Sequence, residues 1–382
     1  MRRRGPMTVS RIYESAMFGR GVRQEPAPTL NSAIPLHDST TPRLLSQAEH
    51  TTEPTGDSSV LLFARERYYW SPARVFRVLR GISTNLPQQI KLLRIMRVPA
   101  YAEFAFCWLT RYSFLPTDPR FRFKFLVRDY PVRGFSTGQR AACFLHHYKR
   151  LHESMSIDLL HRTLHRRVTV FEARREEIHV EISLSLSRPF GNEGELSLNL
   201  HVDGTIVFIL SFTMIPGWVV ESEAEEVLLI SRLQGANGYY SQIRDATKAL
   251  HNVGPAALLL AALDGLAKAF GIGQMAGVSA VRQTSFTEAL SVFYANAYDD
   301  FFTEIGISKN SSGFFLSPIP PEERPMSSIK QGHKIRTKEK RQFKRQLAED
   351  VCLLLRQEMS IKESEPSREE EEIRIVNPLG VS

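Results

Sequence analysis

The stretch from residue 228 to 280 decides the fold: LLISRLQGANGYYSQIRDATKALHNVGPAALLLAALDGLAKAFGIGQMAGVSA. The short apolar run 228–230 predicts a strand, and the glycine-bearing segment 235–238 ends it. Residues 258–270 are too apolar for a surface helix and predict a helix that packs on a sheet. Residues 275–280 predict a second strand. Because such a strand–helix–strand crossover returns to the same sheet, the stretch predicts an α/β centre.

The chain around this centre predicts the rest of the sheet. From residue 168 to 216 apolar and polar residues alternate with a period of two, which is typical of antiparallel strands with one face in a core. Asp203 and Gly204 form a tight hairpin signal. Residues 287–305 predict a helix and residues 313–319 a last strand. The expected fold class is α/β (α+β), with N-terminal helices before an antiparallel meander that continues into the strand–helix–strand core.

Two segments before the meander carry other patterns. Residues 114–135 alternate aromatic and basic side chains, which predicts a half-buried strand with a basic outer face; nucleic-acid bases are another partner for such a face. Residues 138–154 predict a helix capped by Ser136 or Thr137. His161 and His165 have the spacing of a zinc pair, but no third ligand stands nearby at helical spacing, so no metal site is predicted.

Composition bounds the compartment and the partners. The chain has 382 residues, three scattered cysteines and a formal net charge of +8. Three such cysteines give no disulfide framework, which fits a reducing compartment. No apolar run is long enough for a membrane span, and no apolar block follows the basic start. We expect a cytoplasmic protein, with the inner-membrane surface as a peripheral site, because excess positive charge favours partners that carry phosphate.

Composition shifts predict four parts of the chain. Residues 1–58 are rich in Pro, Ser, Thr and Glu and are expected to be disordered. Residues 59–321 form the expected α/β body. Residues 322–357 form a basic helical segment, and residues 358–382 an acidic disordered tail.

A polar set near the glycine turn is the predicted ligand site, and it comprises Arg232, Gln234, Asn237, Arg244, Asp245, Lys248 and His251. The spacing of Arg244, Lys248 and His251 places them on one helix face, where they would hold a phosphate or carboxylate. His251 is the predicted base, since an unperturbed imidazole titrates near neutrality. A solvated helix face with a capping network is the other interpretation.

The late basic run is a second predicted contact surface, made of Arg336, Lys338, Lys340, Arg341, Lys344 and Arg345. Within three helical turns these residues would attract nucleic acid or anionic lipid with little sequence choice. A solvated basic segment that only keeps the protein soluble is the alternative.

The order of strands, glycine turn, helix and strand resembles the GNAT-like acyl-coenzyme A acyltransferase fold. The resemblance implies that the turn Gln234 to Gly238, including Gly235, would bind the pyrophosphate of an acyl-CoA through backbone amides. In that family a tyrosine four residues before a glycine protonates the leaving thiolate. Phe302 holds this place before Gly306, and Tyr298, one turn earlier, is the substitute. Acyl-CoA is the one cofactor this resemblance implies, and whether the chain is an enzyme stays open.

A longer set of motifs over residues 75–356 resembles the VirK/YbjX family of bacterial proteins. The motifs are Gly138-Gln139-Arg140, His147-Tyr148, His201-Val202-Asp203-Gly204, Leu233-Gln234-Gly235, Ala246-Thr247-Lys248-Ala249-Leu250-His251, Gly277-Val278-Ser279 and Tyr298-Asp299-Asp300-Phe301. The resemblance implies a link to virulence, the envelope or stress responses including DNA damage, without an agreed activity.

Overall fold

The structure is a computed structural model that describes residues 124–175, 177–187, 192–236 and 238–364. The helices predicted between residues 59 and 113 and the predicted disordered segment 1–58 lie outside this range. So does the tail beyond residue 364.

A sheet of seven strands organises the fold, and its strand order follows the chain. The strands are β1 (Val168–Arg175), β2 (Ile178–Leu186), β3 (Leu196–Val202), β4 (Thr205–Pro216), β5 (Glu226–Gly235), β6 (Gln274–Val278) and β7 (Phe314–Pro318). Strands β1 to β5 pair antiparallel with their neighbours, β5 and β6 are parallel, and β6 and β7 are antiparallel. The predicted meander and fold class are confirmed.

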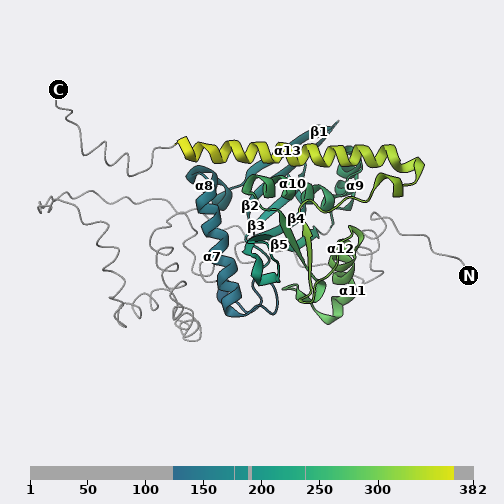
Figure 1. Ribbon diagram of the computed structural model, residues 1–382. Coiled ribbons are helices and arrows are strands. Elements are labelled where there is room, and N and C mark those ends of the chain that lie inside the picture. The colour runs from purple at the N-terminus through teal and green to yellow at the C-terminus, as the bar shows by residue number, and fades with distance from the viewer. Residues whose placement is uncertain (1–123, 176, 188–191, 237, 365–382) are drawn as a thin grey trace, which may run out of the picture. The chain divides into compact units, whose positions relative to one another are not determined.

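Two helices connect the parallel strands, as the central stretch predicts. They are α9 (Tyr240–Ala249) and α10 (Pro255–Phe270). Pro255 opens α10, where its missing N–H costs nothing, and Gly271 ends it at φ 73°. Most of α10 is buried, and it packs against β3, β4 and β5 (Figure 1). The helix α10 is apolar nearly all round because one side packs on the sheet and the other side packs on the last helix.

The first helices lie before the sheet and begin at serine caps. Ser136 and Gln139 form a capping box at the start of α7 (Thr137–Ser154), and Ser156 caps α8 (Ile157–His165). The helix α7 packs on β4, whose recorded pairing with β3 reaches only to Phe212. There the Met214 amide donates to Nδ1 of the buried His147 at 3.1 Å. Burial holds the pKa of His147 well below its ordinary value, which keeps the imidazole neutral and able to accept.

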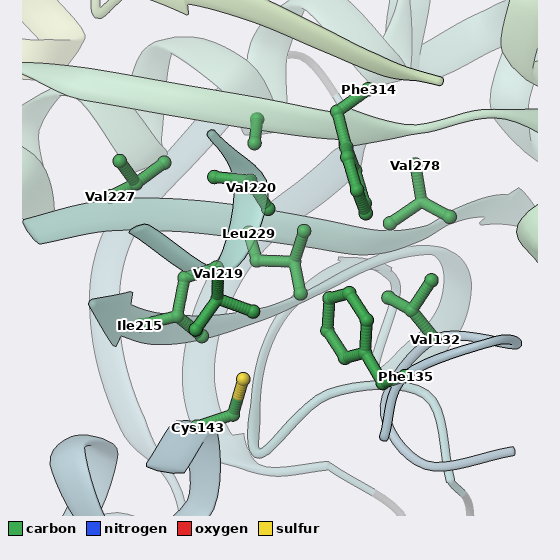
Figure 2. Packing of buried hydrophobic residues seen from close by; sticks show 11 residues of the cluster. Val132, Phe135, Cys143, Ile215, Val219, Val220, Val227, Leu229, Val278 and Phe314 are labelled. Carbon is green, nitrogen blue, oxygen red and sulfur yellow. The ribbon is translucent and has the colours of Figure 1, made fainter. Parts of the chain in front are cut away.

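One face of the sheet around β5 and β6 is covered by an apolar cluster (Figure 2). Its members are Val132, Phe135, Cys143, Ile215, Val219, Val220, Val227, Leu229, Ala276, Val278 and Phe314. The rings of Phe135 and Phe314 lie 5.8 Å apart between centroids. The short 3-10 turn η3 (Gly217–Val220) and the N-terminal part of α7 therefore close this side of the sheet.

The strand predicted over residues 114–135 is wrong for its described part. Residues 124–126 form a 3-10 turn, η2 (Lys124–Leu126), and turns and bends follow up to α7. Lys124 is buried, and its Nζ lies 2.9 Å from Oε1 of the buried Glu195. The pattern misled because Lys124 points inward to a carboxylate and because Pro131 has no N–H for a strand ladder.

The helix predicted over 287–305 is present as four consecutive turns. They are η5 (Glu288–Leu290), α11 (Ser291–Tyr294), the π-helical turn η6 (Ala295–Asp299) and α12 (Asp300–Glu304). Gly306 follows at φ 90° and ends the run. Phe302 stacks on Phe315 of β7, with 5.1 Å between ring centroids. The remaining short turns are η4 (Ala280–Arg282), η7 (Met326–Ser328) and η8 (Gln331–His333).

The last helix, α13 (Lys334–Ser364), lies along α10 and also contacts β1 (Figure 1). Its buried residues are Leu347, Ala348, Val351, Cys352 and Leu355. The predicted disordered tail from residue 358 is corrected here, because the helix continues to Ser364. Among the described residues no helix combines the length and the apolar character needed to cross a membrane.

Candidate functional site

A pocket of about 670 Å³ opens on the sheet face beside the end of β5. Its described lining is Ser185, Leu186, Ser187, Ser197, Asn199, Thr205, Ile206, Ile209, Arg232, Gln234, Gly235, Ala236 and Tyr239. Most of these side chains are hydroxyls, amides or small apolar groups. The described wall therefore mixes polar groups with apolar surface, and Arg232 is its charged member.

Strand pairing explains why polar groups gather there. Ser185 of β2 pairs with Ser197 of β3, and Ser197 pairs with Ser211 of β4, so the three side chains share one face. The amide nitrogen of Asn199 donates to Ser185 Oγ at 3.0 Å. The alternation that predicted these strands also placed these serines on one face of the sheet. Only the structure shows that this polar face forms a pocket.

Arg232 is the charged side chain of the described lining, and a carboxylate balances it. Its Nε lies 3.6 Å from Glu193 Oε2 and donates to Gln234 Oε1 at 3.3 Å. Glu193 Oε1 accepts from Thr284 Oγ1 at 3.0 Å and from Ser285 Oγ at 2.7 Å. Arg232 and Gln234 were predicted site residues. Glu193 was missed, because it lies 39 residues before Arg232 in the chain with no spacing signal.

Tyr298 lies next to this pair, inside the π-helical turn η6. The phenol is buried, and the backbone of Leu233 hydrogen-bonds it. Burial raises the pKa of Tyr298 well above its ordinary value, and the negative charge of Glu193 adds to this. The π-helical turns of proteins are frequent at functional sites. Tyr298, Arg232 and Gln234, predicted from distant parts of the sequence, are thus brought together.

The predicted glycine turn lies at the rim of the pocket. Gly235 still pairs with Phe208, and the Ala236 amide donates to Val207 O at 2.8 Å. Gly238 is exposed at φ 87°, and Asn237 lies outside the described residues. Tyr239 precedes α9 without a side-chain cap. The turn therefore places the start of α9 where a ligand would reach it. The amide of Ala236 is not available to that ligand, because it already donates to Val207 within the sheet.

The basic residues of α9 lie away from the pocket. Arg244 Nε and Lys248 Nζ lie 3.5 Å and 3.6 Å from Asp245 Oδ1, and about two thirds of each side chain is exposed. The prediction that His251 shares their helix face is wrong, because α9 ends at Ala249. His251 adopts φ 53°, and its ring lies 4.9 Å from that of Phe343 on α13.

The predicted basic surface lies on the first half of α13, and half of it is paired. Arg341 Nε, Lys344 Nζ and Arg345 Nη2 surround the Glu323 carboxylate at 3.3, 3.2 and 2.9 Å. Burial, and after it the positive charges of Arg336 and Lys344, lower the pKa of Lys340; both Arg336 and Lys338 are exposed.

These observations define a mixed α/β protein. Its central sheet carries a pocket at the end of β5, where the chain leaves the sheet for the crossover to β6. Residues 95–351 match the family described as "Protein of unknown function (DUF535)", and the chain belongs to this family. Comparison with curated proteins and with solved structures gives no match.

Proposed function

We propose that the chain binds an acyl-CoA thioester at the end of β5. The observation that carries this proposal is that β5 runs on past the end of its parallel partner β6. The recorded pairing of β5 with β6 ends at Ile230, whereas residues 231–235 of β5 continue to the pocket. Tyr298 lies against this continuing segment at Leu233. An extended ligand would lie there along the strand edge.

The start of α9 supports the phosphate end of such a ligand. A helix N-terminus favours anions, and the exposed turn at Gly238 leads directly into that of α9. Arg244 and Lys248, one and two turns further on, carry exposed charge that Asp245 neutralises only in part. In this proposal they contact the phosphates from outside the pocket.

Acyl transfer is the reaction that this arrangement favours. The acceptor heteroatom would bond to the acyl carbon while the carbon–sulfur bond breaks, and the proton that the acceptor loses would reach the leaving thiolate through solvent. Tyr298 would donate a hydrogen bond to the leaving sulfur and keep its proton, because burial and the charge of Glu193 raise the pKa of its phenol. His251 has no part in this proposal, because its ring lies against Phe343.

Binding of acyl-CoA thioesters is expected to raise the melting temperature by about 5–10 °C at a hundred times the dissociation constant. The double variant Arg244→Gln/Lys248→Gln should bind acyl-CoA at least tenfold more weakly. The same variant should bind a short thioester that lacks the nucleotide as the wild type does. Isothermal titration calorimetry measures both.

Lys149→Gln is the control, since this exposed lysine of α7 pairs only locally with Glu153. A folded wild type that no acyl-CoA thioester stabilises would contradict the proposal. So would an equal loss of affinity in Lys149→Gln.

We also propose, as a second candidate, a non-enzymatic role in which α13 binds nucleic acid or anionic lipid. The observation that favours it is the group of cations at the start of α13, where Arg336 and Lys338 are exposed and lie close to Lys340 in the helix. Three further cations share the single carboxylate of Glu323, so the surface keeps an excess of positive charge.

Neutralising Arg336, Lys338 and Lys340 to glutamine should then lower the salt dependence of binding by roughly one unit per lost phosphate contact. Titrations with RNA, duplex DNA and anionic vesicles between low and high salt measure it. Glu323→Gln, which frees three cations, should strengthen the same binding. Unchanged slopes in both variants would reject α13 as the contact surface.

The cellular setting is a proposal as well. The resemblance to VirK/YbjX proteins supports a role in virulence, the envelope or stress responses such as the response to DNA damage. The composition supports a cytoplasmic protein, and the basic surface of α13 supports peripheral contact with the inner membrane.

A further inference from the structure

We infer that the pocket between β2, β3, β4 and β5 takes a neutral, hydroxyl-rich ligand of the saccharide or polyol class, and that Glu193 excludes the phosphorylated counterparts. This inference rests on the proposed function and adds to it that the pocket holds the acceptor of the acyl group. It is carried by the lining, by the charge balance at Arg232 and by the way Glu193 is fixed.

The lining matches hydroxyl groups. Ser185, Ser187 and Ser197 present hydroxyls, and Asn199 and Gln234 present amides. Each of these groups both donates and accepts hydrogen bonds, as a sugar hydroxyl does. Apolar and aromatic surface lies between them, on Leu186, Ile206, Ile209 and Tyr239, and suits the C–H faces of a sugar ring. The volume is in the range of small-molecule sites.

The charge balance decides against an anionic ligand. Arg232 is the cation of the described lining, and its Nε already faces Glu193 Oε2 at 3.6 Å. The two side chains are each 18% exposed, so solvent screens their interaction only in part. A phosphate that bound to Arg232 would also be repelled by the negative charge of Glu193, which lies behind the described lining. The described wall of the pocket is therefore close to neutral overall.

Glu193 cannot leave this position without losing other bonds. Thr284 and Ser285 donate to its Oε1, and Tyr294 Oη in turn donates to Ser285 Oγ at 2.9 Å. An anionic ligand would have to displace a carboxylate held by two hydroxyls. Glu193 thus acts as a specificity-determining residue, because its carboxylate already pairs with the guanidinium of Arg232.

The test compares neutral and phosphorylated members of the same compounds. The probes are glucose, N-acetylglucosamine and glycerol, each against its phosphate monoester, measured by calorimetry. In the wild type at least one neutral member should bind at least tenfold more tightly than its phosphate. In Glu193→Gln, which frees the charge of Arg232, this preference should reverse. The double variant Glu193→Gln/Arg232→Gln should restore the preference for the neutral member.

Glu288→Gln, an exposed site on η5, is the matched control and should behave as the wild type. Three results would overturn the inference: no neutral probe binds, the wild type prefers a phosphate, or folded Glu193→Gln keeps the wild-type preference. Binding of acyl-CoA, measured in the same preparations, tests the proposed function separately from this inference. If acyl-CoA binds while the neutral probes do not, the proposed function stands and this inference fails.

Discussion

Lys124→Met is expected to lower the free energy of unfolding by about 3–5 kcal/mol. Lys124 and Glu195 are 3% and 0% exposed, and Nζ and Oε1 lie 2.9 Å apart. The lysine also donates to Gly194 O at 3.2 Å, and Tyr148 donates to the other oxygen of Glu195. Methionine matches the lysine stem in size, so the main loss is the positive charge. The carboxylate of Glu195 would then be buried beside two tyrosine rings without a cation.

Denaturant unfolding followed by circular dichroism measures this change. Lys149→Met is the matched control, because its partner Glu153 lies 3.7 Å away and both side chains are more than half exposed. Its stability should change by no more than about 0.5 kcal/mol. If the two variants lose the same amount, the buried pair is not a main support of this region.

Gly265→Ala is expected to destabilise the contact between α10 and α13, and Gly265→Leu to do so more strongly. A Cβ at Gly265 would lie 2.3 Å from Ala348 O and 2.8 Å from Val351 Cβ. The obstacle is backbone, so one helix must move, and overpacking of this kind costs about 1–3 kcal/mol. The loss exceeds the gain in helix propensity that alanine brings at an ordinary helical glycine.

Alkylation of Cys352, read by mass spectrometry, reports the separation of the helices. This thiol is 8% exposed on the face of α13 that meets the body, so it should react faster in both variants. Cys143, a buried residue of α7, should keep its low reactivity. Gly273→Ala is the control, since no atom lies within 4 Å of its added Cβ. Unchanged reactivity of Cys352 in Gly265→Leu would contradict the tight packing.

Local patterns predicted most of the sheet correctly. Period-two alternation located β1 to β4, and Asp203 and Gly204 marked the hairpin between β3 and β4, where both adopt positive φ. The apolar length of 258–270 located α10. These features depend on residues close in the sequence, so the sequence contains enough information to place them.

Local patterns could not predict which residues far apart in the sequence pair with one another. The partner of Lys124 is 71 positions away, and the carboxylate beside Arg232 comes from a different connection of the sheet. His251 was misplaced because α9 ends at Ala249, and His251, the first of two left-handed residues after it, lies against Phe343 of α13. Arg232, Gln234 and Tyr298 were found, but only as members of motifs. Their proximity follows from strand register and from the π-helical turn.

The order of the strands has a consequence for biosynthesis. Each strand pairs with the next one in the chain, so β1 to β5 can assemble by successive hairpins as they leave the ribosome. The parallel pair of β5 and β6 is different, because it needs the whole crossover through α10 first. Among the described elements, α10 gains its outer cover later still, when α13 is made. The nascent chain therefore carries an apolar helix before it carries the helix that packs on it.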